Sequence, residues 1–446
     1  MAFGNDPGAA TITYDQGNAD AILKEIYSDE GITNEFFVDN PFLALINKKE
    51  NITGRNYEQT VWASAGQAQS RALGSQFATT QTNAGLSGEA PYVFVVPKVE
   101  NTGVANVSQK AIAETSSTMG AVIDLVKAIA DNQVQQMVND TSFGLYRNSV
   151  PYRGIVAGSV AGTQLTLSNQ GDIINFELNM FLDFASTGAV SGTIRGFATS
   201  NTACQISAID YSSATMTVKW LGSGTQTLTA NTVAVGDYIA RAGDFGVYGV
   251  NTGTGTTTVQ GFNGFLDWIV YGGPASSDSF LGGVNRSQQA TRLAGNYLDG
   301  TGGNLEEVLE KSANRVATVG GKLTHFLMPF SQYTALANSQ GSKVQLVTQK
   351  ADSNIGFDGI QVTGVNGKIT CLPDRYCPTN TIAGIKLASW DLISVGKIVH
   401  TVQSDGKVWL RTYNQNGMEI RFYSLGNVVC KEPRSQVNVR VNPLAT

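Results

Sequence analysis

Residues 66–90 read GQAQSRALGSQFATTQTNAGLSGEA. Only Arg71 and Glu89 are charged in this run, and few of its side chains are able to fill a hydrophobic core. NYEQTVWAS (56–64) precedes the run and PYVFVVPKVE (91–100) follows it. Both flanks have the β-branched and aromatic residues that are typical of strands. The pattern therefore predicts a two-stranded hairpin that carries a long, polar tip.

This predicted hairpin is long compared with the body that carries it. Each leg has about 20 residues and would reach roughly 66 Å when fully extended. A compact body of 446 residues has a radius of gyration of about 22 Å by the usual scaling. The hairpin is thus expected to extend onto a neighbouring copy, in the way that strand addition orders extended segments. Arg71, Phe77 and Leu86 are the residues that we expect to contact this neighbour.

The composition of the chain also favours contact with other copies. Apolar residues make up 42% of the 446 residues, but charged residues make up only 15%, below the roughly 25% of an average soluble protein. Charge is depleted at the centres of protein interfaces. The net charge of −5 gives no basic footprint for specific nucleic-acid binding, although a non-specific DNA lining stays open.

No sequence feature indicates a membrane or a secreted protein. No apolar run approaches the ~20 residues of a membrane helix, and the N-terminal residues MAFGNDPGAATITYDQ lack the regions of a signal peptide. We therefore expect the protein to be made in a cytoplasm.

The residues that carry catalysis are scarce. The chain has no GxSxG, HExxH or P-loop motif. Its two histidines, His325 in LTHFLMPF and His400 in KIVHTVQ, lie in strand-like runs and are interpreted as structural residues. The cysteines form no CxxC pair and are expected to be buried free thiols; they are Cys204, Cys371, Cys377 and Cys430. The sequence thus predicts no catalytic residue, no metal site and no cofactor.

Helical periodicity dominates residues 111–148. Apolar residues recur there at steps of three and four, which predicts one long amphipathic helix. These residues are Met119, Val122, Ile123, Val126, Ile129, Val134, Met137 and Val138. Before it, residues 1–45 read as an extended arm with a short helix, ADAILKEIY.

Residues 151–246 are β-rich and predict a small barrel or sandwich inserted into a larger body. The predicted strands are TQLTLS, GTIRGFA, CQISAID, TMTVKW, TQTLTA and GDYIARAG.

A mixed region follows. NLEEVLEKSANRVATVGG predicts a helix with an Asn304 cap, Glu307 three residues later, and a stop at Gly320 and Gly321. SQYTALANSQ predicts a second, short helix. The predicted strands are HFLMPF, GIQVTGV, KITCLP, GIKLASW, KVWLRTY, MEIRFYS and QVNVRV.

This order of parts resembles the HK97-fold major capsid proteins of tailed bacteriophages. The resemblance is carried by the arm, the long loop, the long helix, and GVNGKITCLPDRYCPTNTIAGIKLASW with the strands after it. It implies an α+β, HK97-like fold with an inserted small all-β domain. The implied domains are an N-terminal arm (1–45), an extended loop (46–100), a peripheral domain with a spine helix (101–150), the inserted β-domain (151–246), an axial domain (247–394) and peripheral C-terminal strands (395–446).

The resemblance implies a non-enzymatic protein that assembles into pentamers and hexamers of an icosahedral phage head around double-stranded DNA. Its partners would be copies of itself, a separate scaffolding protein, a portal, packaged DNA bound non-specifically and, left open, a decoration protein. It would be assembled in the bacterial cytoplasm and located in the virion. Some relatives form lysine–asparagine crosslinks; Lys48 and Lys49 lie near the base of the loop, and no crosslink is expected.

Three other interpretations stay open. An encapsulin-type shell around a cargo enzyme would share the fold. A β-rich tail protein or adhesin would explain the Gly, Ser, Thr and Asn content, but it has no need of the long helix. A hydrolase would use Cys371 or Cys377 with His400.

Overall fold

The computed structural model describes residues 40–64, 90–108, 119–150, 152–157, 162–186, 195, 203–221, 227–228, 233–244, 261–340, 360–401, 409–411 and 417–443. Within these ranges the chain is a mixture of helices and strands, which confirms the predicted α and β character. The helix predicted from ADAILKEIY lies outside the described residues. None of the described helices is long and apolar enough to cross a membrane.

A long antiparallel ladder forms the base of the molecule. β4 (Val99–Ser108) pairs with β19 (Gly417–Cys430) without interruption from Val99 opposite Gly426 to Ser108 opposite Gly417. The other strands of this six-stranded sheet are β1 (Asn47–Lys49), β16 (Trp390–Ser394), β17 (His400–Thr401) and β18 (Trp409–Arg411). α3 (Pro41–Leu45) leads into β1.

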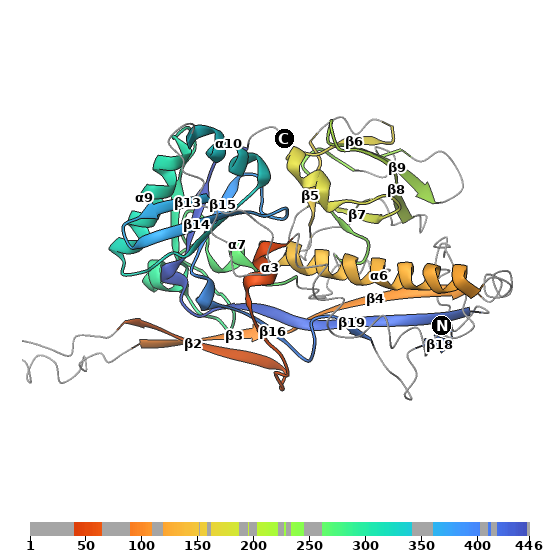
Figure 1. The fold of residues 1–446 in the computed structure, drawn as a ribbon, viewed down its shortest axis with the longest axis horizontal. Coiled ribbons are helices and arrows are strands. Elements are labelled where there is room, and N and C mark those ends of the chain that lie inside the picture. Colours follow the sequence, from red (N-terminus) through yellow and green to blue (C-terminus); the bar gives the residue numbers. More distant parts are fainter. Residues whose placement is uncertain are drawn as a thin grey trace, which may run out of the picture.

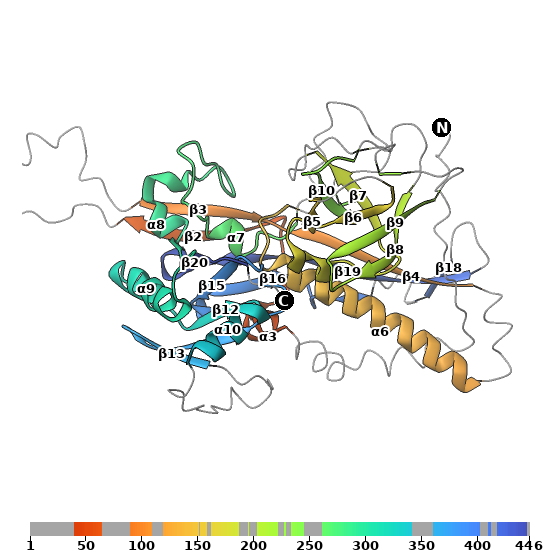
Figure 2. The ribbon, with the colours of Figure 1, turned by 90° about the horizontal axis from the view of Figure 1, so that it is seen from above.

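Helix α6 (Met119–Gly144) lies along this ladder and crosses it at an angle (Figures 1 and 2). Its 26 residues span about 39 Å at 1.5 Å per residue. The long helix was predicted within residues 111–148, and its existence is confirmed. Val134, Met137 and Val138 of the predicted apolar set are buried. Gly103 of β4 allows the close approach, because a Cβ there would lie 2.4 Å from Nε2 of Gln133.

A small all-β unit lies on the opposite side of α6 from the ladder (Figure 1). Its six-stranded sheet has the order β5-β10-β7-β8-β9-β6. The end strands also meet, since Ala157 N donates to Thr166 O at 2.9 Å and Ser168 N donates to Ile155 O at 2.8 Å. The sheet is therefore closed into a barrel. Its strands are β5 (Gly154–Ile155), β6 (Gln164–Thr166), β7 (Phe181–Ala185), β8 (Ala203–Asp210), β9 (Thr215–Leu221) and β10 (Tyr238–Arg241).

One strand of the barrel was missed, and one predicted strand was wrong. β7, with the sequence FLDFA, was not predicted, because four of its five residues are buried and the strand shows no alternation. In TQTLTA, Thr227 and Leu228 are described and are not in a strand. Most of GTIRGFA lies outside the described residues.

The third sheet has parallel and antiparallel pairs, in the order β11-β20-β15-β12-β14-β13. α9 (Leu305–Thr318) and α10 (Phe330–Gln340) pack beside it. The predicted cap of α9 is confirmed, because Asn304 Oδ1 accepts from Glu306 N at 3.2 Å. Its strands are β11 (Asn296–Asp299), β12 (His325–Met328), β13 (Ile360–Gly364), β14 (Gly367–Pro373), β15 (Thr381–Ile385) and β20 (Val437–Arg440).

The single strand predicted for GIKLASW was wrong. β15 ends at Ile385, a 3-10 turn follows, and β16 begins at Trp390 in another sheet. Side chains from distant segments cause this break. Lys386 N donates to Gln436 Oε1 at 2.9 Å, and Leu387 N donates to Thr324 Oγ1 at 3.0 Å. These backbone groups are therefore removed from strand pairing.

The predicted boundary between the axial domain and the peripheral C-terminal strands lies between residues 394 and 395. One strand on each side of this boundary pairs with strands on the other side. β16, on the axial side of the boundary, pairs with β19. β20, on the peripheral side, pairs with β11 and β15. The predicted domain limits stay predictions.

Candidate assembly surface

β2 (Asn56–Ser64) and β3 (Ala90–Pro97) form a two-stranded antiparallel hairpin that projects from one end of the body (Figure 1). The two predicted strands of the hairpin are therefore confirmed. The tip between them lies outside the described residues. Arg71, Phe77 and Leu86, the predicted contact residues, belong to this tip and stay predictions.

The inner face of the hairpin is anchored in the hydrophobic core. Val61, Ala63, Phe94 and Val96 alternate along the two strands and are buried. The ring of Phe94 lies 5.1 Å from that of Trp268, on α7 (Phe265–Trp268), and 5.9 Å from that of Phe280, both edge to face. Such contacts add about 0.5–1.5 kcal/mol to the burial itself. The base of the hairpin is thus held firmly.

The outer face of the hairpin carries an apolar strip, which we define as Trp62, Pro91 and Val93. Trp62 lies opposite Pro91, and Val93 is the diagonal neighbour of Trp62. Trp62 is 59% exposed and Val93 is 40% exposed. No described part of this chain covers the strip. Clustered exposed apolar residues are typical of a protein contact, whereas single ones are ordinary.

The outer edge of β2 has backbone groups that point away from β3. Pro97 lies opposite Asn56, and Pro91 lies opposite Trp62, and proline has no N–H to donate to a partner strand. Val95, opposite Glu58, donates its N–H to Leu281 O at 2.8 Å, outside the hairpin. These are therefore the non-hydrogen-bonded pairs of the ladder. The N–H groups of Asn56, Glu58, Thr60 and Trp62 consequently face outward, and within the described ranges they have no backbone acceptor.

The chain before the hairpin is held by a buried carboxylate. Nζ of Lys49 lies 2.8 Å from the carboxylate of Asp391, Nζ of Lys431 lies 2.7 Å from it, and Asn47 Nδ2 donates to it. Burial alone would raise the pKa of Asp391, but these hydrogen bonds hold it below its ordinary value. Burial lowers the pKa of Lys48 to about 8.

An ionic cluster joins α6 to the barrel. Asp140 of α6 pairs with Arg153 at the start of the barrel, and Arg241 Nη2 lies 3.6 Å from Asp140 Oδ2. Asn101 Nδ2 donates to Asp140 Oδ2 at 2.7 Å. Burial opposes the charge of Asp140, yet Arg241 and Arg153 hold its pKa below the ordinary value. The desolvation of such buried charges offsets much of their attraction, but removal of one partner would leave the other charge buried and unpaired.

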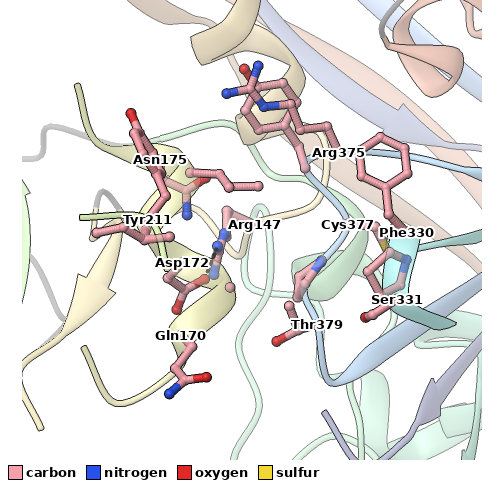
Figure 3. Close-up of a pocket in the computed structure, with 16 residues that line it drawn as sticks. Arg147, Gln170, Asp172, Asn175, Tyr211, Phe330, Ser331, Arg375, Cys377 and Thr379 are labelled. Carbon is pink, nitrogen blue, oxygen red and sulfur yellow. Dashed lines mark hydrogen bonds and ion pairs between the residues drawn. The ribbon is translucent and has the colours of Figure 1, made fainter. Parts of the chain in front are cut away.

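A cleft separates the barrel from the loop between β14 and β15 (Figure 3). Figure 3 shows Asn175 and Tyr211 of the barrel side opposite Phe330, Ser331 and Thr379. Its cavity of about 270 Å³ lies at the lower limit of small-molecule sites, which span ~300–1,000 Å³.

The two sides of the cleft are fastened to each other. Thr379 Oγ1 of the loop donates to Asn169 Oδ1 at 2.7 Å, and Arg147, which follows α6, adds a third segment because its Nη2 lies 3.1 Å from Asp172 Oδ1. Gly171 is pressed against Thr379, because a Cβ there would lie 2.1 Å from its Cγ2. The contacts across the cleft therefore fix the position of the barrel.

The cleft has no activated nucleophile among its described residues. Burial raises the pKa of the Cys377 thiol well above its usual value, and Sγ of Cys377 donates to Thr381 O at 3.4 Å. Burial also raises the pKa of Tyr376 to about 12. The described residues contain no cluster of His, Cys, Asp or Glu that could hold a metal ion.

The histidine and cysteines of the hydrolase interpretation, His400 with Cys371 or Cys377, are not brought together. His400 lies on β17, where its ring packs against Tyr423 of the long ladder. His325 lies on β12, which pairs with β14 of the third sheet; it lies opposite Thr370, so its side chain points to the other face of that sheet from Cys371, and burial lowers its pKa. All four cysteines are buried and free, as predicted. Cys371 and Cys377 belong to β14 and the loop after it, so the geometry gives no support to a Cys–His hydrolase.

The sequence alone did not reveal the apolar strip, the free edge of β2 or the ionic cluster. The period of two in NYEQTVWAS and PYVFVVP separates an inner from an outer face and was the available signal for Trp62 and Val93. The ionic cluster gave no local signal, because Asn101, Asp140, Arg153 and Arg241 come from four separate segments that only the fold brings together.

No family model matches the chain, and no curated protein matches it. Solved structures of low identity are similar to it over most of its length. A chain of the Cyanophage A-1(L) capsid asymmetric unit is 13% identical, with 93% of this chain and 95% of that chain covered and a TM-score of 0.49. A chain of the native GTA particle capsid is 9% identical, with 90% of each covered and a TM-score of 0.42. A chain of Mycobacterium phage Adephagia is 9% identical, with 99% of each covered and a TM-score of 0.41.

Proposed function

We propose that the chain is a structural capsid protein whose copies assemble into pentamers and hexamers of an icosahedral, phage-like shell around double-stranded DNA. The observation that carries the proposal is the projecting β2–β3 hairpin. It has a buried inner face, an apolar strip and an outward edge that nothing described in its own chain covers.

A second copy supplies what this hairpin lacks. An extended strand that adds to the outer edge of β2 accepts and donates the hydrogen bonds that Asn56, Glu58, Thr60 and Trp62 leave outward. Removal of the strip from water adds to this pairing at about 25 cal/mol per Å² of apolar surface. Each contact is modest, but a closed shell repeats it in every copy, and the contacts reinforce one another.

The rest of the molecule suits a lattice more than catalysis. α6 and the β4–β19 ladder form a long, stiff base, and the third sheet sits at one end of it (Figure 1). In this proposal the fold is HK97-like and the domains are those predicted above, except that two strands are exchanged between the axial and peripheral domains. β16 joins the peripheral sheet and β20 joins the axial sheet, as their pairing indicates.

The barrel is the proposed inserted domain. It has its own hydrophobic core and is fastened to α6 through Asp140 and to the third sheet through Thr379. We assign it to the stabilisation of a single subunit shape. The proposed partners are further copies of the chain, a scaffolding protein, a portal and packaged DNA, and the proposed location is the virion.

Electron microscopy of the purified chain, with light scattering for particle mass, tests the proposal. We expect closed shells, or rings of pentameric and hexameric symmetry, when the chain is expressed alone or together with a scaffolding protein. Fibres or discrete trimers under both conditions would refute it. The variant Trp62→Ser is expected to leave the subunit folded and to reduce shell yield.

A further inference from the structure

A second segment of the chain lies along β3 on the side away from β2. We call residues 276–293 the cradle; it ends in α8 (Ala290–Leu293). Three hydrogen bonds join it to the hairpin: Val95 N donates to Leu281 O at 2.8 Å, Tyr92 Oη donates to Gln288 Oε1 at 2.7 Å, and Arg292 Nη1 donates to Ala63 O at 2.5 Å. The cradle therefore contacts both strands.

The contact between the cradle and β3 is close. Gly282 has φ +97°, a conformation that favours glycine, and a Cβ there would lie 2.9 Å from Cγ2 of Val95. The turn at Gly282 consequently follows β3 with no room for a side chain between them. Any shift of the cradle moves the hairpin with it.

Arg286 holds the cradle in shape. Its guanidinium is buried and forms a bidentate ion pair with Asp278, with Nε 2.8 Å from Oδ2 and Nη2 3.1 Å from Oδ1. The remaining nitrogen, Nη1, donates to Asp267 O on α7 at 2.7 Å. One planar group thus ties the cradle to the core, and a lysine, whose donors all sit on one nitrogen, cannot reproduce this fork.

Arg286 also reaches the hairpin through an aromatic stack. Its guanidinium carbon lies 3.7 Å from the centroid of the Phe280 ring, and that ring packs edge to face on Phe94 of β3. Arg286 therefore contacts Phe280, and Phe280 contacts Phe94, so these side chains connect the core to the inner face of the hairpin.

We infer that Arg286 is a positioning residue that sets the angle at which the hairpin leaves the subunit, and so the geometry of the contact with the next copy. The inference rests on the proposed function. In a closed assembly one contact is repeated in every copy, so an altered angle changes curvature and closure instead of affinity alone. Arg286 has this role because its guanidinium binds Asp278 of the cradle, donates to Asp267 O of the core and lies over the Phe280 ring, which packs on Phe94.

The test compares Arg286→Lys with wild type by hydrogen exchange of dissociated subunits and by electron microscopy of assembled ones. We expect amides of β2 and β3 to exchange at least ten-fold faster in the variant, while β4 and β19 stay within two-fold. We also expect open sheets or particles of mixed diameter. Lys311→Met, which removes an exposed pair on α9, is the matched control and is expected to behave as wild type in both assays.

A second variant avoids the Arg286 network. Tyr92→Phe combined with Arg292→Met removes two of the three external hydrogen bonds, and the same loss of hairpin protection and of uniform particles is expected. Unchanged exchange in β2 and β3 with wild-type particles in both variants overturns the inference. Faster exchange throughout β4 and β19 also overturns it, because Arg286 would then be structural only. If wild type never assembles, the proposed function fails, while the exchange comparison still decides the positioning role.

Discussion

Substitution of Trp62 by serine is expected to weaken assembly without weakening the subunit. Burial of a large apolar side chain contributes about 1.5–3 kcal/mol. Trp62 is 59% exposed in the subunit, so a neighbour that covers it contributes roughly 1–2 kcal/mol per copy. Since 1.4 kcal/mol is a factor of ten, the subunit concentration at which shells first appear is expected to rise about 5- to 30-fold.

Light scattering over a dilution series measures this threshold, and thermal unfolding of dissociated subunits measures stability. Leu178→Ser is the control, because Leu178 is 57% exposed on the barrel and lies outside the strip. A threshold that rises no more for Trp62→Ser than for Leu178→Ser would refute the assignment of the strip. A large loss of subunit stability in Trp62→Ser would refute it as well, because the indole would then act within its own chain.

The remaining predictions concern stability. Burial raises the pKa of Asp183 to about 6, above its value in the unfolded chain. Protonated Asp183 therefore contributes to the free energy of unfolding below about pH 4, and this contribution is lost as pH rises through 6; in urea titrations, Asp183→Asn should remove about 2–3 kcal/mol of the pH dependence. Asp391 has a lowered pKa, so its contribution is present above about pH 4 and is lost in acid, and Asp391→Asn should cost about 1–3 kcal/mol at pH 7, reduced because both lysines are partly exposed. A free energy of unfolding that does not change with pH in the wild-type protein would contradict both predictions. Gly171→Ala should cost about 1–3 kcal/mol by pressing on Thr379, and Thr379→Ser in the same chain should restore most of it; equal melting temperatures for the single and double variants would contradict this contact.

Much of the local structure was predictable, because its causes are local. The β-branched and aromatic residues of NYEQTVWAS and PYVFVVP predicted the hairpin, the three- and four-residue steps predicted α6, and Asn304 predicted the start of α9. The candidate surface was predicted only in part. Its hairpin was found, but Trp62 and Val93 were overlooked in favour of Arg71, Phe77 and Leu86, which lie outside the described residues.

Long-range contacts decided the rest. β20 lies between β11 and β15, and the side chain of Gln436 just before it interrupts the predicted strand GIKLASW. The barrel closes through a bridge between Val156 and Leu167, and Asp374 accepts the N–H of Phe42 from 332 positions away. Local pattern determines which residues form a strand or a helix. Which elements meet depends on the burial and hydrogen bonding of groups far apart in the chain, and only the tertiary structure contains that information.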